Sequence, residues 1–299
     1  MQLEHFGTIG ADNLVSTVAG SYDRFSSIAE RKRLNAELVP AFRDQFFSGG
    51  QIQAKVKALV DAADGRHFFL YFRDPPVQHR FARVGMSGNL SYTGNDYVGV
   101  FSQNTNGSKN DYYQHREITD DVRLRPDGSA LVSLHVLVQN RAPSYTLPGP
   151  DPKVGYATRW LDSLVGLFLP NHSRLRSPLV VDGTAESPVF HVPRVPSVHN
   201  RKFLEPSFAL DSGQSWTAQL SYVVGKAAEV GSDGRMVYRL DVDPQPLVTP
   251  ETFAVTVHWP RGWHPTGALP EGWTATRDGA HRTGPLPQVM SVAIPLARG

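Results

Sequence analysis

The chain has 299 residues, no cysteine and a formal net charge of +2, from 30 basic and 28 acidic side chains. The absence of cysteine excludes disulfides, thiolate-bound zinc, iron–sulfur clusters and thiol catalysis. The nearly balanced charge gives no long-range field, so no nucleic-acid partner is expected and an anionic membrane surface is not favoured.

The ends of the chain and its prolines give the first outline. Residues 1–20 lack the basic start and the apolar stretch of a signal peptide. The apolar stretches elsewhere are far shorter than the ~18–20 residues that cross a bilayer, so we expect contact with a membrane only through a segment absent from this chain. Residues 1–116 hold 3 prolines and residues 117–299 hold 20. Because helix interiors exclude proline, the first part should contain helices and the second should be mostly β.

The first part opens with two predicted helices. Asp12 can cap a short helix over residues 13–21. Ser27 and Glu30 form a capping box that opens a second helix. Pro40 should kink this helix. Its apolar stripe, which should face a core, consists of Leu34, Leu38, Phe42 and Phe46.

Helices then alternate with expected strands. The run Arg66–Phe72 predicts a short buried strand. Asp74, followed by two prolines, should cap a further helix that Gly85 ends. Residues 96–101 predict another strand, and the alternation predicts an α/β layer. Between the second helix and the first strand, a third helix is marked by Ile52, Val56, Leu59, Val60 and Ala63.

The second part alternates with period two. Residues 122–125 and 129–139 predict a hairpin around Pro126-Asp127-Gly128. Its returning strand directs four apolar side chains to one face: Val132, Leu134, Val136 and Val138. Further strands are predicted at residues 215–224, 235–242, 253–259 and 289–295.

We therefore expect an α+β multidomain chain. Residues 1–115 would form a partial α/β domain and residues 116–225 a mostly antiparallel, immunoglobulin-like β-sandwich. Residues 226–299 would form a smaller sandwich or an extension of the first.

A search for catalytic motifs finds no nucleophile elbow, phosphate loop or dinucleotide fingerprint, so no catalytic or metal-ligating residue is predicted. Asp120 and Asp121 are adjacent carboxylates, but neighbouring strand residues face opposite sides and cannot share a proton. Phosphate binding is a possible role for three arginines beside the capped helix start, and a solvated helix face with Glu30 and Glu37 as partners is the alternative. These arginines are Arg24, Arg31 and Arg33.

Two groups of residues are candidates for glycan binding. Residues 102–113 offer amides and tyrosines to a sugar, although such a loop is more often self-satisfied. The candidates here are Asn104, Asn106, Lys109 and Tyr112. In the C-terminal tryptophan group, Trp263 and Trp273 can stack on sugar rings, although packing in the sandwich is the more frequent role.

Many short stretches of residues 8–260 resemble, in order, the later portion of a bacterial cell-envelope family known as domain of unknown function four thousand and twelve. They are Gly10–Leu14, Tyr22–Phe25 with Glu30-Arg31, Arg66-His67, Tyr71–Pro75 with Gln78, Gly85–Gly88, Asp96-Tyr97, Asn104–Lys109, Asp111–Tyr113, Asp127-Gly128 and Asn140–Pro143. Members of this family typically begin with a membrane helix and a longer α/β region. The resemblance thus implies that this chain starts partway through that region, and that it lies on the extracellular face of the envelope.

The α/β part is distantly similar to the LytR–CpsA–Psr phosphotransferases, which attach glycopolymers from polyprenyl-pyrophosphate carriers to the cell wall. That similarity implies a pyrophosphate site at Arg24, Arg31 and Arg33, with Mg²⁺ as its cofactor. A second arginine close after the first is missing, since Phe25 and Ser26 stand there. For this chain alone we expect no cofactor.

The function expected first is that of a non-enzymatic envelope protein whose β modules bind envelope glycan or partner proteins. A remote phosphotransferase that uses a polyprenyl-pyrophosphate donor is the alternative. A surface adhesion module without a small ligand is a third hypothesis.

Overall fold

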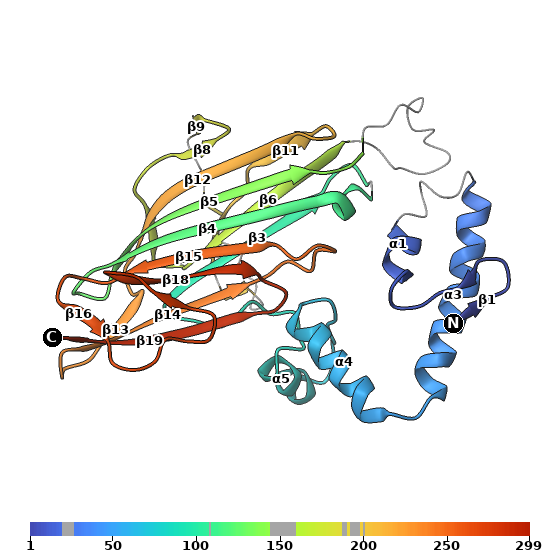
Figure 1. Cartoon of the computed structure of the whole chain (residues 1–299), viewed down its shortest axis with the longest axis horizontal. Helices are drawn as coiled ribbons and strands as arrows, with labels where there is room; N and C mark the ends of the chain where they lie inside the picture. The colour runs from blue at the N-terminus through green and yellow to red at the C-terminus, as the bar shows by residue number, and fades with distance from the viewer. Residues whose placement is uncertain (20–26, 108, 144–159, 187–189, 192–197, 200) are drawn as a thin grey trace.

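The structure is a computed structural model of the chain, and it describes residues 1–19, 27–107, 109–143, 160–186, 190–191, 198–199 and 201–299. Strands dominate and helices are few, which confirms the α+β class. Figure 1 shows the helices in the N-terminal part and a large two-layered β structure formed by the rest of the chain.

Side chains cap two of the helices where the sequence predicts it, at Ser27 and Asp74. The Ser27 hydroxyl accepts a hydrogen bond from the Glu30 amide (3.2 Å), and the Asp74 carboxylate accepts one from the Val77 amide (3.1 Å). The described helices are α1 (Leu14–Ala19), α3 (Ile28–Ser48), α4 (Ile52–Asp64) and α5 (Pro75–Arg83). None of them combines the length and apolar character needed to span a membrane.

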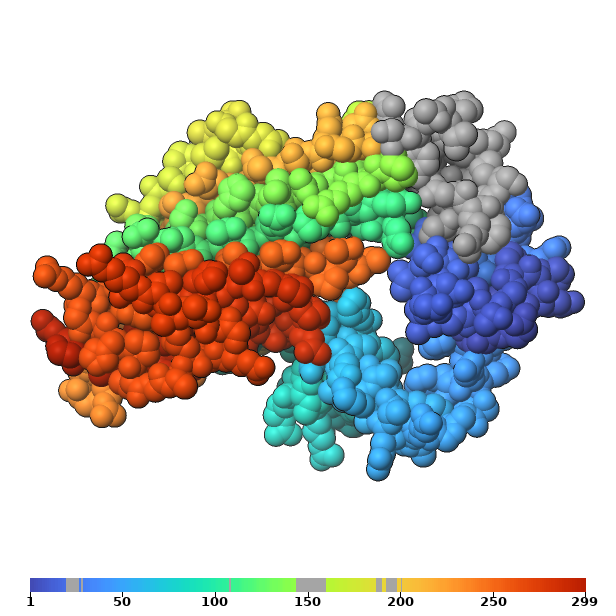
Figure 2. All heavy atoms as spheres, viewed as in Figure 1, coloured from blue at the N-terminus to red at the C-terminus, as the bar shows by residue number. Residues whose placement is uncertain are grey.

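The apolar stripe of α3 is only half buried. Leu34 and Leu38 pack with Leu3 and Ile9 in a small core beside the hairpin of β1 (Gln2–Leu3) and β2 (Gly7–Thr8). Farther along the helix, Phe42 is 51% exposed. In the space-filling view these first elements stand apart from the β structure (Figure 2).

The prediction of a strand at residues 66–72 is wrong, because this stretch forms no strand in the structure. Arg66 instead closes α4, and the side chain of Tyr71 is 80% exposed. The helices also have no α/β layer of their own among the described residues. The expected strand at residue 96 is β3 (Asp96–Asn104), which lies inside the large β structure.

Two sheets form the β-sandwich (Figure 1). Among the described residues the first sheet has eight strands, in the order β10-β6-β3-β14-β19-β16, with β11 paired to β6 and β13 to β14. Their bounds are β6 (Leu161–Leu169), β10 (Lys202–Leu204), β11 (Ser207–Leu210), β13 (Ala228–Val230), β14 (Arg235–Asp243), β16 (Trp263–Pro265) and β19 (Met290–Arg298).

The second sheet has nine described strands, in the order β17-β18-β15-β4-β5-β12-β8-β9, with β7 paired to β12. The predicted hairpin is present as β4 and β5, with Leu124 opposite Ala130. The strands are β4 (Gln114–Leu124), β5 (Ala130–Asn140), β7 (Ser173–Leu175), β8 (Leu179–Val181), β9 (Thr184–Glu186), β12 (Ser215–Val224), β15 (Thr252–His258), β17 (Thr274–Ala275) and β18 (Gly279–Pro285).

Both sheets are mixed. β14 pairs with β3 in parallel, and β15 pairs with β4 in parallel, whereas the other pairs are antiparallel. These two pairs join strands from before and after residue 225 in the same sheets. The strand pairing therefore does not follow the expected boundary between a sandwich at 116–225 and a second one at 226–299.

The core lies between the two sheets. The inward side chains of β5 alternate with outward polar ones as predicted, and all four apolar residues, Val132, Leu134, Val136 and Val138, are fully buried. The helical part meets this sandwich at one end: the Val289 amide, just before β19, donates to the Asp64 carbonyl at the end of α4 (3.1 Å).

Candidate functional site

A cleft of about 670 Å³ lies where the ends of α4 and α5 meet the sandwich. We call it the helix–sandwich cleft. Its lining combines apolar side chains with acidic, basic, hydroxyl and aromatic groups, as is typical of ligand sites. It is lined by Ala63, Asp64, Arg66, His79, Ala82, Arg83, Val84, Gly85, Ser87, Asn89, Leu90, Ser91, Tyr92, His199, Asp243 and Val289.

Arg66 forms one corner of the cleft in a conformation that usually belongs to glycine. Its φ is 60°, and it follows the last turn of α4, where its amide donates to the Ala63 carbonyl (2.9 Å). A left-handed arginine costs roughly 1–2 kcal/mol. Its side chain explains why arginine stands there, because the guanidinium donates to the carbonyls of Gly88 (2.9 Å) and Asn89 (3.0 Å).

Asp243, at the end of β14, ties these segments to the sandwich. One carboxylate oxygen accepts from Arg66 (3.3 Å) and from the Ser91 hydroxyl (2.9 Å). The other accepts from the Ser91 amide (2.7 Å) and from the Tyr97 hydroxyl (2.9 Å). Because four hydrogen bonds occupy this carboxylate, it positions the loop that forms the cleft wall and is not available to a ligand.

Arg201 also contacts the loop that contains Ser91. It donates to the Ser91 carbonyl, and its guanidinium lies 3.6 Å from the centroid of the Tyr97 ring. Burial lowers the pKa of Arg201, and burial next to Asp243 raises the pKa of the Tyr97 phenol well above its usual range. The loop is thus held in place by the buried polar side chains of Arg201, Tyr97 and Asp243.

The rim of the cleft carries an exposed aromatic side chain. Tyr92 is 84% exposed, and its ring meets the His199 ring edge-on at 5.0 Å. His199 has a left-handed φ of 49°, a conformation that costs energy in a residue other than glycine. Burial, together with the charge of Arg201, lowers the pKa of His199, so its imidazole is neutral at neutral pH. Tyr92 therefore packs edge-on against an uncharged imidazole ring and exposes its own ring to solvent.

The conformation of Arg66 leads to a comparison of two variants. Arg66→Gly and Arg66→Ala both lose the guanidinium bonds, but glycine adopts a φ of 60° without strain. We expect Arg66→Gly to be more stable than Arg66→Ala by about 1 kcal/mol. Chemical denaturation of both variants measures this difference, and equal stability would contradict a left-handed Arg66.

Two of the three arginines proposed for phosphate lie within the described residues. Arg24 lies outside the described residues. Arg31 is 9% exposed, whereas Arg33, two residues along α3, is exposed. Of the proposed acidic partners, Glu37 pairs with His5 (2.6 Å) and Glu30 belongs to the Ser27 capping box (3.4 Å). Arg31 and Arg33 do not line the helix–sandwich cleft.

The asparagine-rich loop after β3 satisfies its own polar groups. The Asn104 side chain accepts from the amides of Asn106 (3.1 Å) and Gly107 (3.0 Å) and donates to Asp111 (3.0 Å). Asn106 donates to the Trp160 carbonyl (3.0 Å). Lys109 lies at the end of this loop, and the Tyr112 ring meets the next tyrosine edge-on. This geometry favours the structural role.

The two candidate tryptophans pack against the sandwich. Trp273 is 9% exposed and belongs to the main core, and Trp263, in β16, is partly buried against the same core. Neither lines the helix–sandwich cleft. The structure therefore does not gather the proposed glycan-binding residues at one place.

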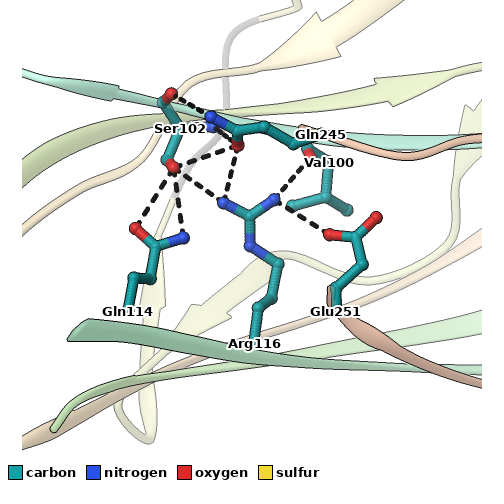
Figure 3. Close-up of polar contacts among 6 residues, drawn as sticks. All are labelled: Val100, Ser102, Gln114, Arg116, Gln245 and Glu251. Carbon is teal, nitrogen blue, oxygen red and sulfur yellow. Dashed lines mark hydrogen bonds and ion pairs between the residues drawn. The ribbon is translucent and has the colours of Figure 1, made fainter. Parts of the chain in front are cut away.

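A buried polar network crosses the sandwich core elsewhere (Figure 3). Arg116, fully buried on β4, donates to the Val100 carbonyl (2.6 Å), the Ser102 hydroxyl (2.7 Å) and the Gln245 side chain (2.8 Å), and it pairs with Glu251 (3.1 Å). Burial raises the pKa of Glu251 to about 7, an effect that Arg116 opposes. Since both charged side chains are fully buried, the network joins the sheets and offers no surface to a ligand.

A second buried group lies between the sheets. Asp96 accepts from the Tyr238 hydroxyl (3.0 Å), whereas both oxygens of Asp120 and the hydroxyl of Tyr222 have no hydrogen-bond partner among the described residues. Burial raises the pKa of Asp96 to about 6, and burial next to Asp96 raises that of Asp120 well above its usual range. As predicted, Asp121 faces away from Asp120; it pairs with Arg123 (3.2 Å).

Among the described residues, no three His, Asp or Glu side chains are grouped so that they could hold a metal ion. The Mg²⁺ that the phosphotransferase resemblance implies thus has no ligand set in that part of the chain.

No family model and no characterised protein sequence matches the chain. Solved structures give weak similarities. A Legionella pneumophila protein described as a nutrient-binding protein aligns at 8% identity and a TM-score of 0.46, over 68% of this chain and 71% of its own. Leukotriene A4 hydrolase from Saccharomyces cerevisiae aligns at 9% identity and a TM-score of 0.34, over 61% of this chain and 29% of the hydrolase. An M1 zinc metallopeptidase from Deinococcus radiodurans aligns at 12% identity and a TM-score of 0.30, over 62% of this chain and 41% of the metallopeptidase.

The chain thus spans less than half of the hydrolase and less than half of the metallopeptidase. At these TM-scores the similarities carry no argument about the function of this chain.

Proposed function

We propose that the chain is a non-enzymatic, glycan-binding protein of the bacterial cell envelope and that the helix–sandwich cleft is its glycan site. The family resemblance is the basis for the envelope location, and we keep an immunoglobulin-like binding module as the proposed role of the sandwich. The observation that carries the proposal is Tyr92, an 84% exposed tyrosine at the rim of a cleft lined by both apolar and polar side chains.

An exposed ring beside polar groups fits the chemistry of a sugar. Aromatic faces pack on the C–H faces of sugar rings, and neighbouring donors and acceptors bind the hydroxyls. Tyr92 offers such a face, and Asp64, His79 and Ser87 line the same cleft.

The phosphotransferase alternative is not supported to the same degree. Of its arginines, the described Arg31 and Arg33 do not line the cleft, and Arg31 is almost buried. Envelope proteins are the second expected class of partner, and the binding test below separates them from glycan.

We expect Tyr92→Ala to weaken binding of purified bacterial wall polysaccharide about tenfold, the equivalent of ~1.4 kcal/mol. Tyr71→Ala is the matched control, because Tyr71 is 80% exposed and does not line the cleft. Isothermal titration of the folded variants measures both. Equal affinity of Tyr92→Ala and Tyr71→Ala would reject the cleft as the glycan site. Absence of polysaccharide binding by the unaltered chain would reject glycan as the ligand and favour an envelope protein.

A further inference from the structure

One wall of the helix–sandwich cleft carries two basic side chains from α5. His79 and Arg83 stand four residues apart, so they are neighbours on one face of the helix, and both line the cleft. Both are exposed, and the structure shows no hydrogen bond or ion pair for either side chain within the described residues. Asp64, which also lines the cleft, forms no ion pair with Arg83 within the described residues.

The position of Arg83 has a second explanation that needs no ligand. Cations in the last turn of a helix interact favourably with its dipole, by ~0.3–1 kcal/mol. Arg80 is also in the last turn of α5, and it does not line the cleft. The dipole therefore explains both arginines equally, but it does not explain why Arg83 and His79 share the face that lines the cleft.

Two of the charged side chains in the cleft already have partners. The Asp243 carboxylate accepts four hydrogen bonds, and the Arg66 guanidinium is bound to Gly88, Asn89 and Asp243. The exposed Arg83 guanidinium and the exposed His79 ring are left for a ligand, and the exposed Asp64 carboxylate lies in the same cleft. A guanidinium binds carboxylate and phosphate oxygens bidentately, which a neutral hydroxyl cannot match.

We propose that the cleft holds its glycan through an acidic group, a carboxylate or a phosphate of the ligand, which is bound by Arg83 with His79 beside it. This inference rests on the proposed glycan function and names the class of glycan: one that carries anionic groups. Tyr92 packs on the sugar ring, and Arg83 favours glycans that carry an anionic group over neutral ones.

The test compares three probes on the full chain: an oligogalacturonate, the same oligomer with its carboxylates reduced to alcohols, and a glycerol-phosphate polymer without sugar rings. We expect at least a tenfold preference for the oligogalacturonate over the reduced oligomer, which Arg83→Gln abolishes. Arg80→Gln is the matched control, since it removes the same charge from the same helix turn outside the cleft. The preference should persist in that variant.

The outcomes separate the two proposals. Equal binding of the two sugar oligomers by the unaltered chain overturns the acidic-group inference and leaves the glycan function standing. The same loss of preference in Arg80→Gln and Arg83→Gln also overturns it, because general charge would then explain the preference. Tighter binding of the glycerol-phosphate polymer, lost in Arg83→Gln, supports the inference with phosphate as the source. Failure of all three probes to bind removes both proposals.

Discussion

Replacing Arg116 with methionine should lower the free energy of unfolding by about 3–5 kcal/mol, the usual cost of removing one partner of a buried ion pair. Arg116 and Glu251 are both fully buried, and Arg116 also supplies donors to three further groups of the network in Figure 3. Methionine fills much of the same volume but leaves Glu251 and the Gln245 side chain without these donors. Urea denaturation monitored by tryptophan fluorescence measures the loss.

Two variants make this prediction specific. Arg123→Met, on the same strand, removes an exposed pair with Asp121 (side chain of Arg123 61% exposed) and should cost less than ~1 kcal/mol. The double variant Arg116→Met with Glu251→Leu replaces both charges with apolar groups and should recover at least half of the loss. If Arg116→Met costs no more than Arg123→Met, the network does not hold the two sheets together.

The chain should become less stable as the pH rises from 4 to 7. The folded pKa of Asp96 is raised from 3.8 to about 6, and that of Glu251 from 4.5 to about 7, in both cases because of burial. A raised carboxyl pKa means that the unfolded chain releases its proton first, so the stability present below pH ~4 is lost as the pH rises through the folded values. For Asp96 alone, a shift of this size corresponds to ~3 kcal/mol.

Asp120→Asn tests the same buried group directly. The amide is nearly isosteric and cannot ionise, and no hydrogen bond to the Asp120 oxygens is lost within the described residues. We expect the variant to be more stable than the unaltered chain at pH 8. This advantage should shrink as the pH falls toward 4, because protons then begin to bind the unfolded carboxyl as well.

Asp121→Asn, one residue along β4, provides the control. Its side chain faces outward and pairs with Arg123 (3.2 Å) and His258 (3.3 Å), so the same substitution should bring no gain in stability at pH 8. Denaturation curves at pH 4, 5, 6, 7 and 8 compare the two variants. A flat stability profile of the unaltered chain between pH 4 and 7, or no gain in Asp120→Asn at pH 8, would contradict a protonated carboxyl in the core.

Much of the sandwich could be predicted from the sequence, because period-two alternation reports directly which side chains are buried. The strand predicted at residues 215–224 is β12 with the same bounds, and the hairpin of β4 and β5 turns at Asp127-Gly128 as expected. The caps at Ser27 and Asp74 were also predictable, since each needs only residues a few positions apart.

The arrangement of the strands could not be predicted in this way. The parallel pairs place Leu240 beside Asp96 and Thr252 beside Glu117. Alternation shows which face of a strand is buried but carries no information on which distant strand lies next to it. The apolar run at residues 66–72 resembles a strand in sequence, but no strand among the described residues pairs with it.

The cleft was missed for a related reason. Its residues come from the ends of α4 and α5, the loop before β3, the end of β14 and His199, which meet only in the folded chain. One signal was present in the sequence: the Asp74 cap sets the register of α5 and thereby places His79 and Arg83 on one face. The sequence could not show that Tyr92, and not a tryptophan, offers its ring to a sugar. That distinction depends on the exposed fractions in the folded chain, which are 84% for Tyr92 and 9% for Trp273.

The measurement that tests the proposed glycan site most directly is amide hydrogen exchange of the full chain with and without wall polysaccharide. We expect slower exchange in residues 82–92, which form the wall and rim of the helix–sandwich cleft, and unchanged exchange in residues 104–107 and 109–113. Slower exchange in the asparagine-rich loop after β3, with residues 82–92 unchanged, would contradict the assignment of the glycan site to this cleft.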